Sequence, residues 1–130
     1  MDKTAFNFKA TGIGSVPSLG VQDTCIHILE QLPEIPFWPQ LVKRTHLEDM
    51  NIQFSEGLPL LEIREEKRAL AISAKNRESE LVAFYDRFLT EDVDYFGISR
   101  GFAPGLYELV DLIQKNPKPY GPYVKGQTVG

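Results

Sequence analysis

Cysteine is almost absent from this chain of 130 residues, since Cys25 is the only one. An intramolecular disulfide is therefore impossible, and a reducing, cytoplasmic compartment is the natural expectation. Long apolar runs are also missing, and residues 1–4 do not open a basic region followed by an apolar stretch. The sequence argues against a membrane-spanning helix and a secretory signal, so no membrane partner is expected.

Positive charge is scarce as well. The chain has 14 Lys and Arg against 18 Asp and Glu, a net charge of −4, and its cations are scattered rather than striped. A charge distribution of this kind does not attract phosphate backbones, so nucleic acid is not expected as a partner. A hydrophobic share of 42% over 130 residues suits one compact unit, and residues 1–130 are interpreted as a single domain.

Three segments repeat apolar residues at the spacing of a helix. The first covers residues 21–32 and stops at Pro33, and the second covers residues 77–89 behind a possible cap at Asn76. The third covers residues 104–116, with proline in its first turn. The second helix is expected to pack in the core through an apolar stripe made of Leu81, Phe84, Tyr85 and Phe88.

The remaining pattern predicts strands and one short helix. Residues 6–15, 35–41 and 123–130 are expected to be strands, and apolar residues that alternate over 60–73 predict a hairpin. A short helix is expected over 45–54, because Thr45 and Glu48 have the spacing of a capping box. With no internal repeat, this order of elements predicts an α/β fold with an accessory hairpin.

Three motifs stand out in the chain. They are Ile13-Gly14-Ser15-Val16-Pro17, then Ile35-Pro36-Phe37-Trp38-Pro39-Gln40-Leu41 with Ser55-Glu56-Gly57-Leu58-Pro59 downstream, and Lys125-Gly126-Gln127-Thr128-Val129-Gly130. Together they resemble the superfamily that joins cobalamin-independent methionine synthase with uroporphyrinogen decarboxylase and the corrinoid-dependent methyltransferases. The first motif is similar to the Ile-Gly-Ser-x-Pro sequence after the first barrel strand of that group, and the last is similar to its Lys-Gly-Gln-x-x-Gly-Pro strand.

The resemblance implies a TIM (β/α)8 barrel, which needs roughly 250 residues. We therefore expect a partial barrel: the first two to three βα units with an inserted β-hairpin, from an amino-terminal fragment or a split gene product. The complete protein would be a methionine-synthase-like methyltransferase that transfers a methyl group to a homocysteine-like thiol. A complementary C-terminal part or self-association is the expected partnership, because open strand edges pair with other chains.

Zinc is the cofactor that the resemblance implies for the complete protein. Family members hold it with His, Cys and Cys, often with Glu, on strands later than Gly130. The candidates within this chain are Cys25, His27 and His46. Cys25 lies on the inward stripe of its helix and His27 faces elsewhere, so no zinc site is expected here. The chain alone is expected to be inactive.

Substrate-binding residues are also implied by the resemblance. Ile13, Gly14 and Ser15 match positions that contact the amino-acid substrate, with Ser15 bound to its carboxylate. The alternative is that this glycine-containing segment is only a turn. Gln127, on the final strand, is a further candidate if its side chain faces the barrel interior.

Two more candidates have equally simple structural explanations. Trp38 and Gln40 could line a pocket, one by stacking and the other by hydrogen bonds, but a tryptophan can also fill the core. Glu56 could bind an ammonium group, although a carboxylate near a turn is commonly solvated.

Other functions remain open from the sequence. The chain could be a non-catalytic subunit or a self-contained interaction module. A uroporphyrinogen decarboxylase would carry an arginine-rich segment where this chain has only Lys43 and Arg44. Gly12 and Gly14 lack the third glycine of a dinucleotide fingerprint.

Overall fold

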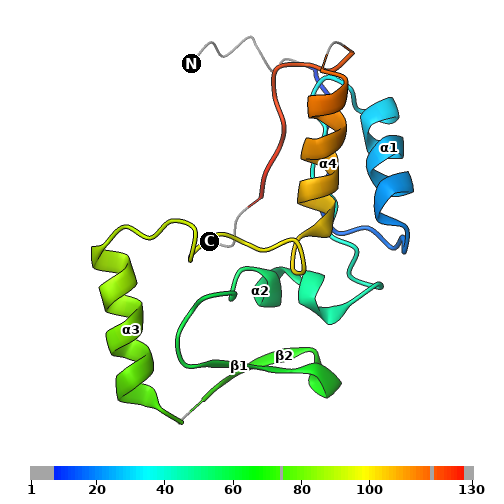
Figure 1. Cartoon of the computed structure of the whole chain (residues 1–130). Helices are drawn as coiled ribbons and strands as arrows, with labels where there is room; N and C mark the ends of the chain where they lie inside the picture. The colour runs from blue at the N-terminus through cyan, green and yellow to red at the C-terminus, as the bar shows by residue number, and fades with distance from the viewer. Residues whose placement is uncertain (1–7, 74, 118, 128–130) are drawn as a thin grey trace.

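The computed structural model describes residues 8–73, 75–117 and 119–127 and has a mixed α/β fold. Figure 1 shows α1 and α4 side by side, α2 next to the hairpin, and α3 apart from the other helices. The elements in chain order are α1 (Val21–Gln31), α2 (Met50–Gln53), β1 (Leu61–Arg64), β2 (Ala69–Ile72), α3 (Arg77–Leu89) and α4 (Pro104–Lys115).

Three extended segments, residues 12–16, 36–40 and 125–127, lie side by side. Ser15 and Gln40 form a parallel bridge, and Phe37 and Lys125 form another. Segment 36–40 is therefore the central one, with the earlier and the later segment on its two sides. Parallel neighbours of this kind are the pairing that an α/β unit requires.

The strands predicted over 6–15, 35–41 and 123–130 are thus only partly confirmed. Their described residues pair through isolated bridges rather than regular ladders, and residues 6, 7 and 128–130 lie outside the described chain. The reason lies in the central segment, where Pro36 and Pro39 have no N–H to donate.

The central segment also changes its hydrogen-bonding direction. The Trp38 N–H donates to Lys125 O over 3.4 Å, whereas the Gln40 N–H donates to Gly14 O over 2.6 Å. In a regular strand, residues two apart bond to the same neighbour. The hydrogen-bonding partner of the central segment therefore changes at Pro39, from segment 125–127 to segment 12–16, and this change prevents a continuous ladder.

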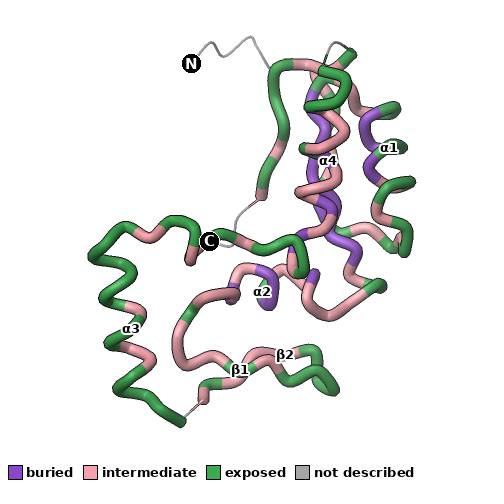
Figure 2. Tube along the Cα trace, viewed as in Figure 1, coloured by how far each residue is buried: buried purple, intermediate pink, exposed green. Residues whose placement is uncertain are grey.

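Helices α1 and α4 cover the central segment and form the core with it. Cys25, Leu29, Trp38 and Leu109 are buried there together, and Figure 2 shows the buried colour concentrated along this part of the chain. The start of α4 lies so close to the central segment that a Cβ on Gly105 would be 2.1 Å from the carbonyl oxygen of Pro39. Glycine at this position is what permits the close approach.

The predicted helix over 45–54 is divided in two. Residues 46–48 form a 3-10 turn, capped by Thr45 Oγ1, which accepts the Leu47 N–H over 3.3 Å. Asp49 is extended, with φ −63° and ψ 132°, and α2 begins after it. An extended residue cannot continue a helix, so the apolar spacing was right but the continuity was wrong.

The hairpin over 60–73 is confirmed. β1 and β2 are antiparallel, and Leu61 pairs with Ile72 and Ile63 with Leu70. Their turn is the 3-10 helix Glu65–Lys67, followed by Arg68 in the left-handed region with φ 47°. Arg68 takes the conformation that glycine commonly supplies after such a turn.

Helix α3 has the predicted bounds but not the predicted burial. None of its residues is buried, and Tyr85 and Phe88 are 58% and 62% exposed, so the expectation of a core stripe was wrong. The predicted side-chain cap at Asn76 was also wrong. Asn76 has φ 54° and makes no side-chain cap, and its carbonyl oxygen accepts the Glu80 N–H instead.

No helix in the part of the chain that the structure describes combines the length and the apolar character needed to cross a bilayer.

Candidate functional site

A chain of hydrogen bonds, made mainly by side-chain amides, links the three parallel segments. The backbone N–H of Gly14 donates to Gln127 Oε1 over 3.1 Å, and Gln127 Nε2 donates to Gln40 Oε1. Gln40 Nε2 then donates to Gln53 Oε1 over 2.5 Å. Gln53 Nε2 ends the chain on the carbonyl oxygen of Phe102, at 2.7 Å. Three predicted site residues, Gly14, Gln40 and Gln127, are therefore brought together.

Two glutamines of this amide chain are buried, so their polar groups need hydrogen-bond partners within the protein. Gln40 is 0% exposed and Gln53 is 1% exposed. A buried amide needs partners for its N–H and C=O groups, and each of these two has one of each kind. Gly14 allows the approach of Gln127, because a Cβ on Gly14 would lie 2.1 Å from Gln127 Nε2.

Ser15 and Ile13 lie beside the amide chain and face outwards. Ser15 is exposed and Ile13 is 73% exposed. Within the described residues, neither the hydroxyl nor the backbone N–H of Ser15 has a hydrogen-bond partner. These two donors are the kind that binds a carboxylate.

Lys125 is held at the start of the same segments. Its Nζ donates to the carbonyl oxygen of Gly12 over 2.8 Å, and its backbone N–H donates to Pro36 O over 2.8 Å. Lys125 thus ties the first and third segments together across the central one.

Trp38 and Glu56 do not join the site. Trp38 is 7% exposed and lies in the core, with its ring 6.2 Å from that of Phe54, so the core-filling alternative is the one observed. Glu56 Oε2 accepts the backbone N–H of Ser99 over 2.6 Å. Its carboxylate connects two loops at the surface and does not lie with the amide chain.

Two buried polar residues were not predicted from the sequence. Gln53 belongs to the amide chain, and Glu48, 0% exposed, accepts the Leu41 N–H and the Arg44 Nε–H, both over 2.9 Å. The spacing of Arg44 and Glu48, four residues apart, is the signal that could have predicted this ion pair. The sequence instead favoured Glu48 as part of a helix cap.

The thiol of Cys25 is poorly suited to metal binding or nucleophilic attack. Burial is the main reason that its pKa rises from 9.0 to about 12, and the negative charges of Glu108 and Glu48 raise it further. Zinc ligands and nucleophiles need the thiolate. Among the described residues, no three His, Cys, Asp or Glu side chains gather as a metal site requires.

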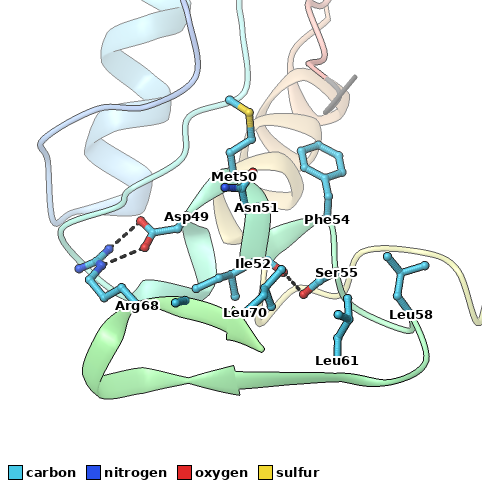
Figure 3. Close-up of a pocket in the computed structure, with 11 residues that line it drawn as sticks. Asp49, Met50, Asn51, Ile52, Phe54, Ser55, Leu58, Leu61, Arg68 and Leu70 are labelled. Atoms are coloured by element: carbon cyan, nitrogen blue, oxygen red, sulfur yellow. Dashed lines mark hydrogen bonds and ion pairs between the residues drawn. The ribbon is translucent and has the colours of Figure 1, made fainter. Parts of the chain in front are cut away.

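A cavity of about 680 Å³ lies elsewhere, between α2 and the hairpin. Figure 3 shows Ile52, Leu61 and Leu70 along it, with the ion pair of Asp49 and Arg68 at one side. The shortest distance in that ion pair is 2.7 Å, and the Arg68 guanidinium also donates to a backbone carbonyl. The charges of Asp49 and Arg68 are paired with each other, and most of the other residues that line the cavity are apolar.

A second cavity of about 570 Å³ adjoins the loop that follows Ser15. It lies between this loop and α1, and its lining includes Val16, Pro17, Ile28 and Phe37. The segment that carries Ser15 therefore borders an apolar space large enough for a small ligand.

Comparison of the chain with models of protein families, with curated protein sequences and with solved structures gives no match.

Proposed function

We propose that this chain supplies the first strand and helix units of a methionine-synthase-like barrel, and that the complete protein transfers a methyl group to a homocysteine-like thiol. The supporting observation is that Gly14, Gln40 and Gln127 meet in one hydrogen-bonded chain. Each comes from a different motif of the resemblance. Active sites of such barrels lie at the carboxyl ends of the strands, and in the proposed barrel this hydrogen-bonded chain would lie at that end.

The chain's own residues would bind and orient the amino-acid end of the substrate. Ser15 would donate its hydroxyl and backbone N–H to the carboxylate, since both donors lack partners among the described residues. Gln127 accepts the Gly14 N–H and so fixes the backbone beside Ser15. The exposed side chain of Ile13 would contact the apolar part of the substrate.

The described residues do not fit a zinc site. The pKa of Cys25 is raised to about 12, and no ligand cluster forms among the residues the structure describes. Zinc would activate the substrate thiol in the complete protein, and its ligands would have to come from another part of it. The role proposed for this chain is therefore substrate binding.

A titration of the isotope-labelled chain with L-homocysteine or L-methionine tests this role. We expect saturable changes in the amide resonances of Gly14 and Ser15 and in the side-chain amide of Gln127. The substitution Ser15→Ala should weaken binding at least tenfold, whereas the matched substitution Ser79→Ala on the exposed face of α3 should not. Methioninol, which lacks the carboxylate, should bind weakly. Equal affinity of both variants for methionine would contradict the proposed role.

A non-catalytic, self-associating module is the second candidate. Segments 12–16 and 125–127 lie at the two outer edges of the parallel arrangement, and Ile13 and Val124 beside these edges are 73% and 47% exposed. Open edges pair with other chains. Sedimentation equilibrium should then show association that increases with concentration, and a clean monomer at high concentration would exclude this candidate.

A further inference from the structure

Helix α3 has a continuous apolar face that is open to solvent. At about 100° per residue, its apolar positions cover nearly half of the helix circumference. Figure 2 shows no buried residue on this helix. The exposed members, with their exposed fractions, are Val82 (69%), Tyr85 (58%), Phe88 (62%), Leu89 (78%) and, just beyond the helix, Val93 (75%). We call these five residues the α3 face.

Phe84 borders the α3 face and is held by aromatic contacts on both sides, since its ring lies 5.7 Å from that of Tyr85 and 6.3 Å from that of Phe88. The Phe84 ring meets the Phe96 ring edge to face at 5.6 Å, and Phe96 meets Tyr95 in the same way at 5.2 Å. Arg87 lies 4.1 Å from the centre of the Tyr95 ring and also pairs with Asp92 over 3.1 Å. These contacts hold the helix against the loop that follows it.

The same region carries a concentrated negative charge. Residues 77–94 contain six Asp and Glu against two Arg, a net charge of −4, which equals the net charge of the whole chain. Within this region Arg87 and Asp92 neutralise each other over 3.1 Å, and Glu80 Oε2 accepts the backbone N–H of Leu60 over 2.8 Å. Asp86 follows Val82 by four residues and borders the α3 face directly.

We propose that the α3 face is a docking surface for a protein partner that presents an amphipathic helix with a lysine- or arginine-rich margin. The apolar side chains would supply contact area, and the acidic border would select a basic partner and increase the rate of encounter. This docking does not depend on the proposed methyltransferase role.

Charge complementarity also argues against other occupants. A second copy of the chain would bring another segment of net charge −4 against the first. Like charges facing each other across an interface oppose association. Anionic lipid and nucleic acid are disfavoured for the same reason.

Two synthetic helical peptides test the docking by fluorescence anisotropy. Both carry leucines on one face, and their other face carries lysine in the first peptide and glutamate in the second. We expect the full chain to bind the lysine peptide at least tenfold more tightly than the glutamate peptide at low salt. The difference should shrink as salt is raised, because surface charges are screened. Equal binding of both peptides would overturn the proposal.

Variants locate the binding surface. The double substitution Val82→Gln and Leu89→Gln should weaken binding of the lysine peptide at least tenfold, with helicity by circular dichroism unchanged. The control Ile72→Gln changes an apolar residue that is 81% exposed on β2, and it should leave binding unchanged. Equal weakening by both would overturn the proposal, as would a dimer of the unmodified chain that the double substitution dissociates.

Discussion

Replacement of Gln40 by leucine should destabilise the protein by about 2 kcal/mol. Leucine has a similar size, so packing is largely kept while two side-chain hydrogen bonds are lost. Gln53 is 1% exposed, and its Oε1 would lose its donor without access to water. A buried polar group left unpaired costs about 1–3 kcal/mol. Gln127 is only half-buried and can bond to water, so its loss adds little.

Urea denaturation followed by tryptophan fluorescence measures this change. Trp38 is the only tryptophan and is 7% exposed, so its emission reports on the core directly. With a slope of about 2 kcal/mol per molar urea, the midpoint should fall by about 1 M. The control Gln114→Leu changes an exposed residue of α4 and should alter stability by less than about 0.5 kcal/mol.

A double-mutant cycle refines the test. When Gln40→Leu and Gln53→Leu are combined, both ends of their hydrogen bond become apolar, which is far less costly than leaving one end unpaired. The double variant should therefore lose at least about 1 kcal/mol less than the sum of the single variants. Additive effects, or a Gln40→Leu variant as stable as the original protein, would refute the amide chain as a structural unit.

Three further predictions concern the core. Gly105→Ala should destabilise the fold by about 1–3 kcal/mol in urea denaturation, because the new Cβ would lie 2.1 Å from a backbone carbonyl oxygen. The control Gly126→Ala, whose new Cβ would have no atom within 4 Å, should be neutral or slightly stabilising. Cys25 should resist iodoacetamide at pH 9.5 until the chain unfolds, and rapid alkylation of the folded protein would contradict this. The pKa of Cys25 is about 12 in the folded chain against 9.0 for an ordinary thiol, so its contribution to stability should be lost as the pH rises from about 9 to about 12. Glu48→Ala should cost about 1–3 kcal/mol, because the buried Leu41 N–H would lose its acceptor. The exposed control Glu66→Ala should cost less than about 0.5 kcal/mol, and similar thermal unfolding of the two variants would contradict the prediction.

The sequence predicted local elements well, because their signals are local. The helix expected over 21–32 is α1 (Val21–Gln31), and the hairpin lies where alternation placed it. The bounds of α3 are also as expected, since apolar spacing specifies a helix. The same spacing cannot say whether a partner covers the apolar stripe, which is why the burial of α3 was wrong.

The candidate site was predictable only in part. Gly14, Gln40 and Gln127 were named from their motifs, and the structure joins them. Gln53 was missed because a glutamine beside a short helix carries no sign of burial until distant segments close around it. Trp38 shows the opposite case, because it was named from a motif as a pocket residue but its side chain is buried in the core. Both outcomes depend on tertiary packing, which single-residue patterns do not contain.

Nuclear Overhauser spectroscopy tests most directly whether residues 12–16, 36–40 and 125–127 meet in parallel. We predict cross-peaks between the amide proton of Gly14 and the side-chain amide of Gln127, with parallel backbone contacts across the Ser15–Gln40 and Phe37–Lys125 bridges. Only short-range contacts within each segment, or an antiparallel pattern between them, would contradict the site described above.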